Sequence, residues 1–329
     1  MTTYIFRRIL LIFPTIFGIT LLTFLLVRLA PGNAAEARGA GNENGARAMT
    51  AEQREEIVRL YGLDKPILVA YGEWLARLAR LDLGESFVDH RPVTEKMEER
   101  LPLTMSLAGA ALVLSYVIAV PLGVVAALRR GERIDRTITF VVFVLYSIPS
   151  FAAALLLILL AAGGDYLNLF PMYGIHSINS SDMTPWQSFW DRVDHMILPV
   201  VCLTYARFAS ISRFTRVSML EVLGQDYLRT ARAKGLSEQA VVLRHALRNA
   251  LIPIITIFTL ELPALIGGSV IIETIFSLPG MGQLMLQSLE ARDTPVLMGG
   301  TVLAAVITLL SYLLADILYV VVDPRMKYE

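Results

Sequence analysis

Three charged side chains stand out within the apolar runs of this 329-residue chain: Arg207, Glu261 and Asp316. A charge held in hydrocarbon is costly, so such a residue is by default an ion-pair partner or part of a path for a polar solute. Asp316 lies towards one end of its run, where we expect it to meet a basic loop. Arg207 and Glu261 lie deeper, and their chemistry would be electrostatic.

Arg207 and Glu261 are opposite in sign and similar in depth. At ~1.5 Å per helical residue, Arg207 lies roughly 18 Å from the outer start of its run and Glu261 roughly 17 Å from the inner start of its own. In a ~30 Å core these depths nearly coincide. We therefore expect the two residues to face each other, or a common translocation path, in mid-membrane. The alternative is that Arg207 extends towards the cytoplasm and Glu261 is hydrogen-bonded locally.

The residue inventory offers little for covalent or metal chemistry. Cys202 is the one cysteine, the four histidines are isolated, and the absence of any Gly-Lys dipeptide rules out a G-x-x-x-x-G-K-[ST] phosphate loop. A membrane-embedded enzyme would also need a nucleophile–base pair or an H-E-x-x-H set. We expect no catalytic residue, metal or cofactor in this chain, and packing or solvation for the histidines.

The elements that position these charges follow from composition. The chain is 55% hydrophobic and 18% charged, whereas soluble proteins average about 45–50% and 25%. A helix needs about 20 residues to cross a membrane. Five runs qualify, and a sixth, His195–Met219, is weaker because arginines interrupt it. The five are Ile9–Leu29, Leu103–Leu128, Thr137–Ala162, Ala250–Ile272 and Val296–Val322. The sequence predicts an all-α integral membrane protein and excludes a soluble, disordered or nucleic-acid-binding chain.

Basic residues distinguish the two sides of the predicted membrane. With six spans and a cytoplasmic N-terminus, the inside segments hold 16 lysines and arginines and the short outside loops hold 2. This is the bias expected of cytoplasmic loops. A five-span alternative would combine a basic and an acidic stretch in one loop. We therefore expect six transmembrane helices with both termini in the cytoplasm.

The first hundred residues divide into two predicted parts. Residues 1–30 are expected to be an uncleaved N-terminal transmembrane helix, because their apolar run exceeds the usual 7–15 residues of a signal peptide. Residues 31–101 are then an extracytoplasmic helical insertion. Within it, Thr50–Gln53 has capping-box spacing for a helix that Gly62 ends. A second helix beginning near Pro66 would group Trp74, Leu75 and Leu78.

Two outer surfaces are left open at this stage. The helix after Pro66 would either meet a delivered solute or its carrier, or lie as an amphipathic helix on the bilayer. The second outer loop, Gly163–Asp194, is aromatic and acidic, which suits a membrane–water interface.

The longest cytoplasmic segment, residues 221–249, is predicted to form two short helices. Gly235 is a natural left-handed stop and Ser237 can cap the next helix, so the turn falls at Ala233–Ser237. Its apolar residues are Leu228, Ala231, Leu236, Val241 and Leu243. They would either receive a protein partner or fold against the chain's own bundle.

At this turn the sequence resembles the EAA loop of ABC-importer permeases, and specifically the oligopeptide/dipeptide branch. Supporting blocks cover essentially the whole chain: Arg7–Gly32, Tyr61–Pro66, Leu81–Phe87, Arg91–Val93, Glu99–Pro102, Pro121–Gly131, Leu223–Glu238, His245–Pro253, Glu273–Gly282, Ala291–Val296 and Asp323–Arg325. Two departures from the general pattern are similar to the peptide branch. Arg229-Thr230 replaces Glu-Ala, and Arg248 stands where a Leu-Pro pair is usual, with Pro253 later.

The resemblance implies a permease core at residues 102–322, with the EAA-like coupling loop 221–249 between the fourth and fifth spans, and a cytoplasmic tail at 323–329. It implies ATPase-coupling residues Asp226, Arg229, Thr230, Ala231, Lys234, Gly235, Leu236, Ser237 and Glu238. An outer gate region would include Glu273, Phe276, Pro279 and Gly280.

The implied function is a permease subunit of an ATP-driven importer in the bacterial inner membrane, surrounded by lipid. Its partners would be a homologous second permease, two cytoplasmic ATPase subunits that bind ATP and Mg, and an extracytoplasmic solute-binding protein. Peptides are the expected cargo, and nickel or glutathione are alternatives within the family. A secondary transporter is a further alternative, but no inverted repeat is evident and the cytoplasmic bend would lack a purpose.

Overall fold

The regular structure of this chain is helical. The computed structural model describes residues 2–29, 65–162, 166–178 and 180–322, and within them the only β-pairing is an isolated bridge between Glu85 and Pro92. The helices are α1 (Thr2–Leu29), α4 (Ile67–Leu78), α5 (Val93–Leu128), α6 (Arg133–Ser147), α7 (Ser150–Ala161), a 3-10 turn (Ser180–Asp182), α8 (Pro185–Leu223), α9 (Asp226–Ala233), α10 (Glu238–Ala240), a π-helical turn (Val241–Ala246), α11 (Leu247–Glu261), α12 (Ala264–Gly267), α13 (Val270–Ile275), α14 (Met281–Glu290) and α15 (Thr294–Val322). The expected helix between Thr50 and Gly62 and the tail 323–329 lie outside the described residues.

Five helical segments in the described part of the chain are long and apolar enough to cross a membrane. They are Leu10–Leu29, Val93–Leu128, Pro185–Leu223, Glu238–Ile275 and Thr294–Tyr319. The bent pair α6–α7 adds a sixth if the two helices count as one span. The predicted all-α membrane class, with five to six candidate spans, is confirmed.

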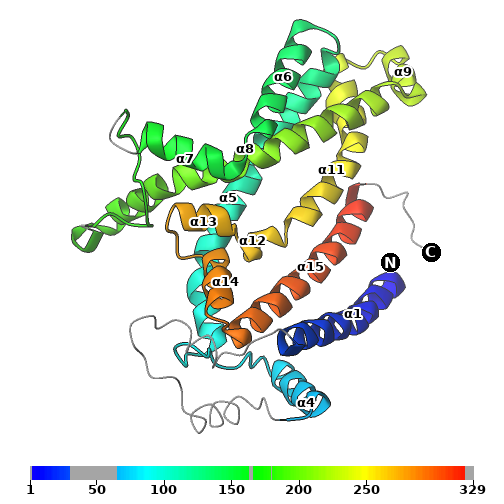
Figure 1. Ribbon diagram of the computed structural model, residues 1–329. Helices are drawn as coiled ribbons and strands as arrows, with labels where there is room; N and C mark the ends of the chain where they lie inside the picture. The colour runs from blue at the N-terminus through cyan, green and yellow to red at the C-terminus, as the bar shows by residue number, and fades with distance from the viewer. Residues whose placement is uncertain (1, 30–64, 163–165, 179, 323–329) are drawn as a thin grey trace.

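Helices α5 and α8 form the most extensive pair and occupy the centre of the bundle (Figure 1). Gly123 permits their close approach, because a Cβ at that position would lie 2.6 Å from the Ser212 carbonyl oxygen and 2.6 Å from Cβ of Thr215. Helix α11 packs on α8 and on α15, and α1 packs on α15 at the edge of the bundle.

The weakest predicted span is the longest helix of the described chain. Helix α8 runs without a break over 39 residues, so the arginines that interrupt His195–Met219 do not end it. Its start is well specified: the Thr184 side chain accepts a hydrogen bond from the Gln187 amide, and the Gln187 side chain accepts one from the Thr184 amide. Arg216 then holds α8 to α6 through a two-point contact with Asp135, at 2.7 and 2.9 Å.

A sharp bend divides the predicted span Thr137–Ala162 into two helices. Helices α6 and α7 meet at Ile148–Pro149 with a bend of 94°. Ile148 is extended because the residue before a proline avoids the helical region, and Pro149 has no amide hydrogen with which to continue the helix. The Ile148 carbonyl oxygen, which the helix break leaves without a helical partner, accepts a hydrogen bond from the Tyr205 hydroxyl at 2.9 Å.

The predicted span Ala250–Ile272 is also not one uninterrupted helix. It starts earlier, since α11 begins at Leu247, and α11 ends at Glu261. Pro263 follows, and Gly268 has a φ of +69°, a left-handed conformation that glycine adopts without steric cost. Short helices α12 and α13 complete the segment. The break places Glu261 at a helix end instead of mid-helix.

The end of the bundle that is predicted to lie outside, called the outer end below, is built from α4 and the start of α5. Helix α4 begins immediately after Pro66, as predicted. Tyr71 and Trp74 are buried against Phe24 of α1 and Met298 and Val302 of α15, so this face of α4 is covered by the chain itself. Helix α5 begins at Val93, ahead of the expected Leu103, and so runs through the predicted boundary at residue 101.

The start of α8 carries an exposed aromatic cluster. Trp186, Phe189 and Trp190 contact one another at centroid distances of 5.5 to 6.0 Å, and each is at least 48% exposed. Together with α7, this end of α8 projects from one side of the bundle (Figure 1). The predicted histidine environments are ordinary: His195 is buried, and Nδ1 of its ring lies 2.7 Å from the Asp191 carbonyl oxygen.

Candidate functional site

The bend within residues 221–249, predicted to be cytoplasmic, has the expected two-helix form. Helix α9 ends at Ala233, and Gly235 then adopts a φ of +79°, where any other residue would be strained. The Ser237 hydroxyl accepts a hydrogen bond from the Ala240 amide and caps α10. The turn at Ala233–Ser237 therefore arises from local chemistry.

The apolar residues of the bend divide into a buried group and an exposed group. Leu228, Ala231 and Val241 are buried in a cluster whose other buried members include Val124, Ala127, Met219 and Ala250. These three fold against the chain's own bundle. Leu236 and Leu243 are 43% and 53% exposed, so the chain itself does not cover them, and contact of the bend with a partner stays a prediction.

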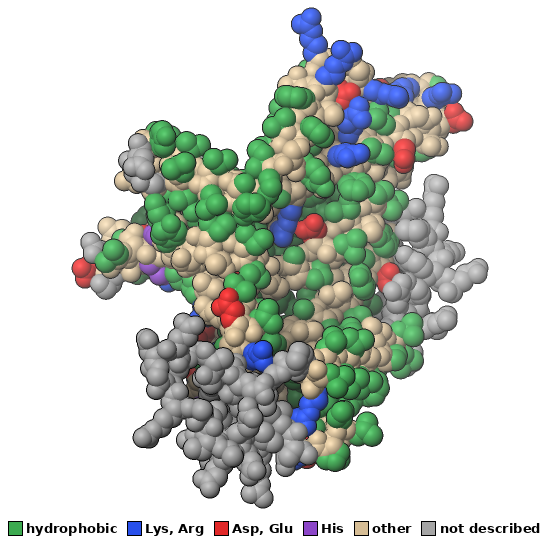
Figure 2. Space-filling view, viewed as in Figure 1, with side chains coloured by type: hydrophobic (Ala, Val, Ile, Leu, Met, Phe, Trp, Pro, Cys, Tyr) green, Lys and Arg blue, Asp and Glu red, His purple; other side chains and the backbone are tan. Residues whose placement is uncertain are grey.

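The charged side chains of the bend are mainly exposed. Arg232 makes a two-point contact with Glu238 at 3.0 and 2.8 Å, which ties the end of α9 to the start of α10. Hydrogen bonding to Glu238 raises the pKa of Arg232 above its ordinary value. Asp226, Arg229, Thr230, Lys234 and Glu238 are all exposed. Figure 2 shows lysine and arginine side chains gathering at this end of the molecule, around α6 and α9.

The predicted contact between Arg207 and Glu261 is present. Nε of Arg207 in α8 lies 3.0 Å from Oε2 of Glu261 at the end of α11, with the side chains 15% and 30% exposed. Nη1 of Arg207 also donates to the Ala108 carbonyl oxygen at 3.4 Å. The alternative, in which the two residues point apart, is excluded for this conformation. Asp316 is buried in α15, and its pairing with a basic loop stays a prediction.

A small cavity is lined both by Arg207 of the charge pair and by Glu273 of the α12–α13 segment. It has a volume of about 20 Å³ and is lined by residues of α5, α8 and the α12–α13 segment, including Thr104, Arg207, Ser269 and Glu273. A volume of this size holds about one water molecule.

The predicted gate residues meet around a buried carboxylate. Glu273 is 2% exposed and accepts hydrogen bonds from the Thr104 hydroxyl at 3.1 Å, the Ser269 amide at 3.3 Å and the Gln283 amide at 2.9 Å. Phe276 is buried in a cluster with Leu107 and Leu198. Pro279 is half-buried in the loop that leads to Gly280.

Three glycines enclose this carboxylate. A Cβ at Gly268, Gly280 or Gly282 would lie within 2.9 Å of an atom of Glu273. Thr104 completes the enclosure, since its hydroxyl also accepts a hydrogen bond from the Met281 amide at 2.8 Å. We did not predict Thr104, Gly268 or Gly282 as site residues. The only signal was the run of glycines near Glu273, because Thr104 is distant in sequence.

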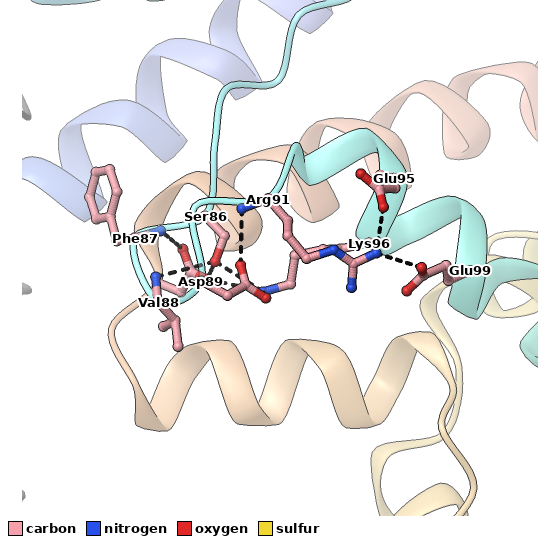
Figure 3. A network of polar contacts seen from close by, with 9 residues as sticks. Ser86, Phe87, Val88, Asp89, Arg91, Glu95, Lys96 and Glu99 are labelled. Atoms are coloured by element: carbon pink, nitrogen blue, oxygen red, sulfur yellow. Dashed lines mark hydrogen bonds and ion pairs between the residues drawn. The ribbon is translucent and has the colours of Figure 1, made fainter.

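A second polar network that we did not predict closes the outer end of the bundle (Figure 3). Asp293, which is 1% exposed, accepts hydrogen bonds from the Ser86 hydroxyl at 2.5 Å and the Phe87 amide at 2.9 Å. Lys96 lies 3.0 Å from Asp89 and 3.7 Å from Asp293. The network joins the loop before α5 to the start of α15.

Electrostatics at this network follows from its contacts. Burial alone would raise the pKa of Asp89. Hydrogen bonds from Lys96, Ser86 and the Arg91 amide together outweigh this effect, so the pKa of Asp89 lies below its ordinary value. Hydrogen bonds to Glu99 and Glu95 raise the pKa of Arg91. Asp89 and Arg91 therefore keep their charges near neutral pH.

We expect Asp293→Asn to destabilise the outer end of the bundle. The substitution removes a buried charge near Lys96, which retains Asp89 as an ion-pair partner, and weakens hydrogen bonds to a charged group worth about 2 kcal/mol. The Tm of the purified protein should fall by several degrees, and protease should cut the loop 82–92 faster. Asp182→Asn, at an exposed aspartate of the other outer loop, is the control. Equal Tm values for the two variants would refute a stabilising role for Asp293.

Two sequence families match consecutive parts of the chain. The family described as "Binding-protein-dependent transport system inner membrane component" matches residues 119–328, and its N-terminal companion matches residues 1–108. Full-length relatives include the oligopeptide transport system permease protein AppB of Bacillus subtilis, 41% identical over 329 residues, and the dipeptide transport system permease protein DppB of Escherichia coli, 37% identical over 345 residues. The di/tripeptide transport system permease protein DppB of Pseudomonas aeruginosa is 39% identical over 340 residues. Each alignment covers 100% of both chains.

A solved structure shares the fold. A chain of the methionine ABC transporter MetNI, in an inward-facing conformation, aligns with a TM-score of 0.51 and 19% identity. The alignment covers 70% of this chain and 97% of the other. The chain therefore belongs to the binding-protein-dependent transport system inner membrane components and is a permease of the peptide-transport branch of the ABC importers, a membrane-spanning subunit and not an enzyme.

Proposed function

We propose that this chain is one of two homologous permease subunits that together form an alternating-access path for peptides or similar small solutes. Two cytoplasmic ATPase subunits, which hold ATP and Mg, would drive the path, and an extracytoplasmic solute-binding protein would load it. The chain would cross the bacterial inner membrane six times, with both termini in the cytoplasm. The transport of oligopeptides, dipeptides and di/tripeptides named for its relatives supports this cargo.

One observation carries the proposal: the cytoplasmic bend directly links the two helices that hold the charge pair. Helix α8 ends at Leu223 and α11 begins at Leu247, and α9 is held against both through the cluster around Leu228. Arg207 lies roughly 24 Å up α8 from the bend at ~1.5 Å per residue. A push on the bend would therefore move α8 and α11 as rigid bodies and act on the contact between Arg207 and Glu261.

The outer segment would close the path at the end opposite to the cytoplasmic bend. Glu273 and its glycines fix the turn between α12 and α14, and the cavity below them is too small for a solute. We propose that Glu273, Phe276, Pro279 and Gly280 form the outer gate in its closed arrangement.

Leu236→Asp tests the coupling role of the bend. Leu236 is exposed, so the substitution should leave the Tm of the permease unchanged. It would place a charge where an apolar residue is expected to contact the ATPase, and we expect the amount of ATPase that co-purifies with the permease to fall about tenfold or more. Co-purification from cells that express the whole importer, quantified by mass spectrometry, measures this loss.

Leu243→Asp is the matched control, since Leu243 is an exposed leucine on the π-helical turn beyond the bend. It should retain the ATPase. If the wild-type permease binds no ATPase, the importer assignment fails. If both variants retain the ATPase, the bend is not the coupling surface.

A further inference from the structure

Two arginines of α8 form ion pairs of different geometry. Arg216 donates hydrogen bonds to both carboxylate oxygens of Asp135, from Nε to Oδ1 at 2.7 Å and from Nη2 to Oδ2 at 2.9 Å. Arg207 meets Glu261 through a single close contact, Nε to Oε2 at 3.0 Å. A planar guanidinium presents its donors as a fork that matches both oxygens of a carboxylate. The Arg207–Glu261 contact uses only one of these donors closely, so another carboxylate can replace Glu261 more easily than it could replace Asp135.

A further polar group adjoins this pair. The Tyr116 hydroxyl oxygen is buried and has no hydrogen-bond partner among the residues that the structure describes. Its ring packs edge-on against Phe258, three residues before Glu261, at a centroid distance of 5.5 Å, and it interacts electrostatically with both charges. A buried hydroxyl without a partner is costly. It is a buried donor without a partner among the described residues, on the helix face that Phe258 contacts and within electrostatic reach of both charges.

From these features we propose that the Arg207–Glu261 pair is a transient binding site for zwitterionic solutes, with Arg207 taking the solute carboxylate and Glu261 the solute ammonium group. This proposal rests on the proposed function, because it assumes that the solute passes the pair. The Tyr116 hydroxyl would donate to the bound solute. The two ends of an extended dipeptide are roughly 7 Å apart, so the pair must separate as the solute enters.

The selectivity of such a site follows from the cost of an unpaired charge. Opening the pair in a membrane exposes one cation and one anion, and each is expensive to leave alone. A zwitterion replaces both lost contacts. An N-acetylated solute would leave Glu261 without a partner, and a C-amidated solute would leave Arg207 without one. The pair therefore favours solutes with both ends free, in addition to any selection by the binding protein.

The test uses the complete importer in proteoliposomes and three solutes: alanyl-alanine, its N-acetyl derivative and its C-terminal amide. We expect Glu261→Gln to lower the preference for the free peptide over the N-acetyl derivative about tenfold, with the preference over the amide little changed. Arg207→Gln should show the reverse pattern. The binding protein is the same throughout, so its selectivity cancels when the uptake ratio of each variant is divided by the uptake ratio of the wild type.

Arg216→Gln is the matched control on the same helix. This substitution removes an ion pair between helices that does not contact the solute in our proposal. It should therefore reduce the uptake of all three solutes by the same factor. The double variant Arg207→Gln with Glu261→Gln carries no unpaired charge, so it should fold and transport with neither preference. If the binding protein rejects a blocked solute, the comparison is repeated without it, as the Tm shift that each solute causes in the purified complex.

The outcomes separate this inference from the proposed function. Preferences that shift by less than twofold in both single variants, while transport persists, would overturn the zwitterion site and leave the importer assignment intact. An absence of ATP-dependent uptake of any of the three solutes by the wild-type complex would instead refute peptide import.

Discussion

Replacing Gly280 with alanine should abolish transport and lower the Tm of the permease substantially. The new Cβ would lie 2.5 Å from Cδ of Glu273 and 2.7 Å from Oγ1 of Thr104, closer than carbon atoms approach in real structures. Neither neighbour is free to move, because Glu273 is held by three hydrogen bonds and Thr104 bridges two segments. Overpacking of a fixed site costs about 3 kcal/mol. Thermal unfolding of the purified protein and peptide uptake measure the effect.

Gly267→Ala provides the control for this prediction. Gly267 lies in α12, next to the same site, but nothing lies within 4 Å of its hypothetical Cβ. It should keep the wild-type Tm within a degree or two. An unchanged Tm for Gly280→Ala alone would show that Glu273 is not held as described.

Leu228→Asp should uncouple ATP hydrolysis from transport. Leu228 is fully buried in the cluster that holds α9 against α5, α8 and the start of α11. A carboxylate there, with no partner, costs several kcal/mol. An eight-residue helix has little stability of its own, so α9 should detach while the bundle stays folded. We expect peptide uptake to fall at least tenfold, with faster amide hydrogen exchange confined to residues 224–246.

Leu243→Asp is again the comparison, since it adds the same charge at an exposed leucine. It should leave both the exchange pattern and the uptake near those of the wild type. Two results would count against the rigid link between α9 and the spans. One is normal uptake by Leu228→Asp, and the other is unfolding of the entire bundle, which would show that α9 is not a separable unit.

Features that depend on neighbouring residues were predictable. The bend at Ala233–Ser237 follows from a left-handed glycine and a capping serine within three residues, and both act as expected. The start of α4 after Pro66 follows from the fixed φ of proline in the same way. The Arg207–Glu261 contact was predictable for a different reason. The membrane makes an isolated charge so costly that depth and sign alone favour pairing.

Features that depend on backbone geometry were harder to predict. Pro149 breaks a span, whereas Pro199 lies within the continuous helix α8. The same residue type gives different outcomes because neighbouring helices decide whether the freed backbone groups are satisfied. At Ile148 the Tyr205 hydroxyl supplies that partner, and Tyr205 lies 57 residues away in the chain.

The sequence by itself determined the membrane class, the number of apolar runs, the cytoplasmic bend and the candidate charge pair. These depend on hydrophobicity and charge, which the bilayer sorts residue by residue. Only the tertiary structure decided that Glu273 lies among Thr104 and three glycines, and that Asp293 anchors Ser86 across 207 positions of the chain. Such sites form where packed helices bring distant residues together, and no local pattern records which of them will meet.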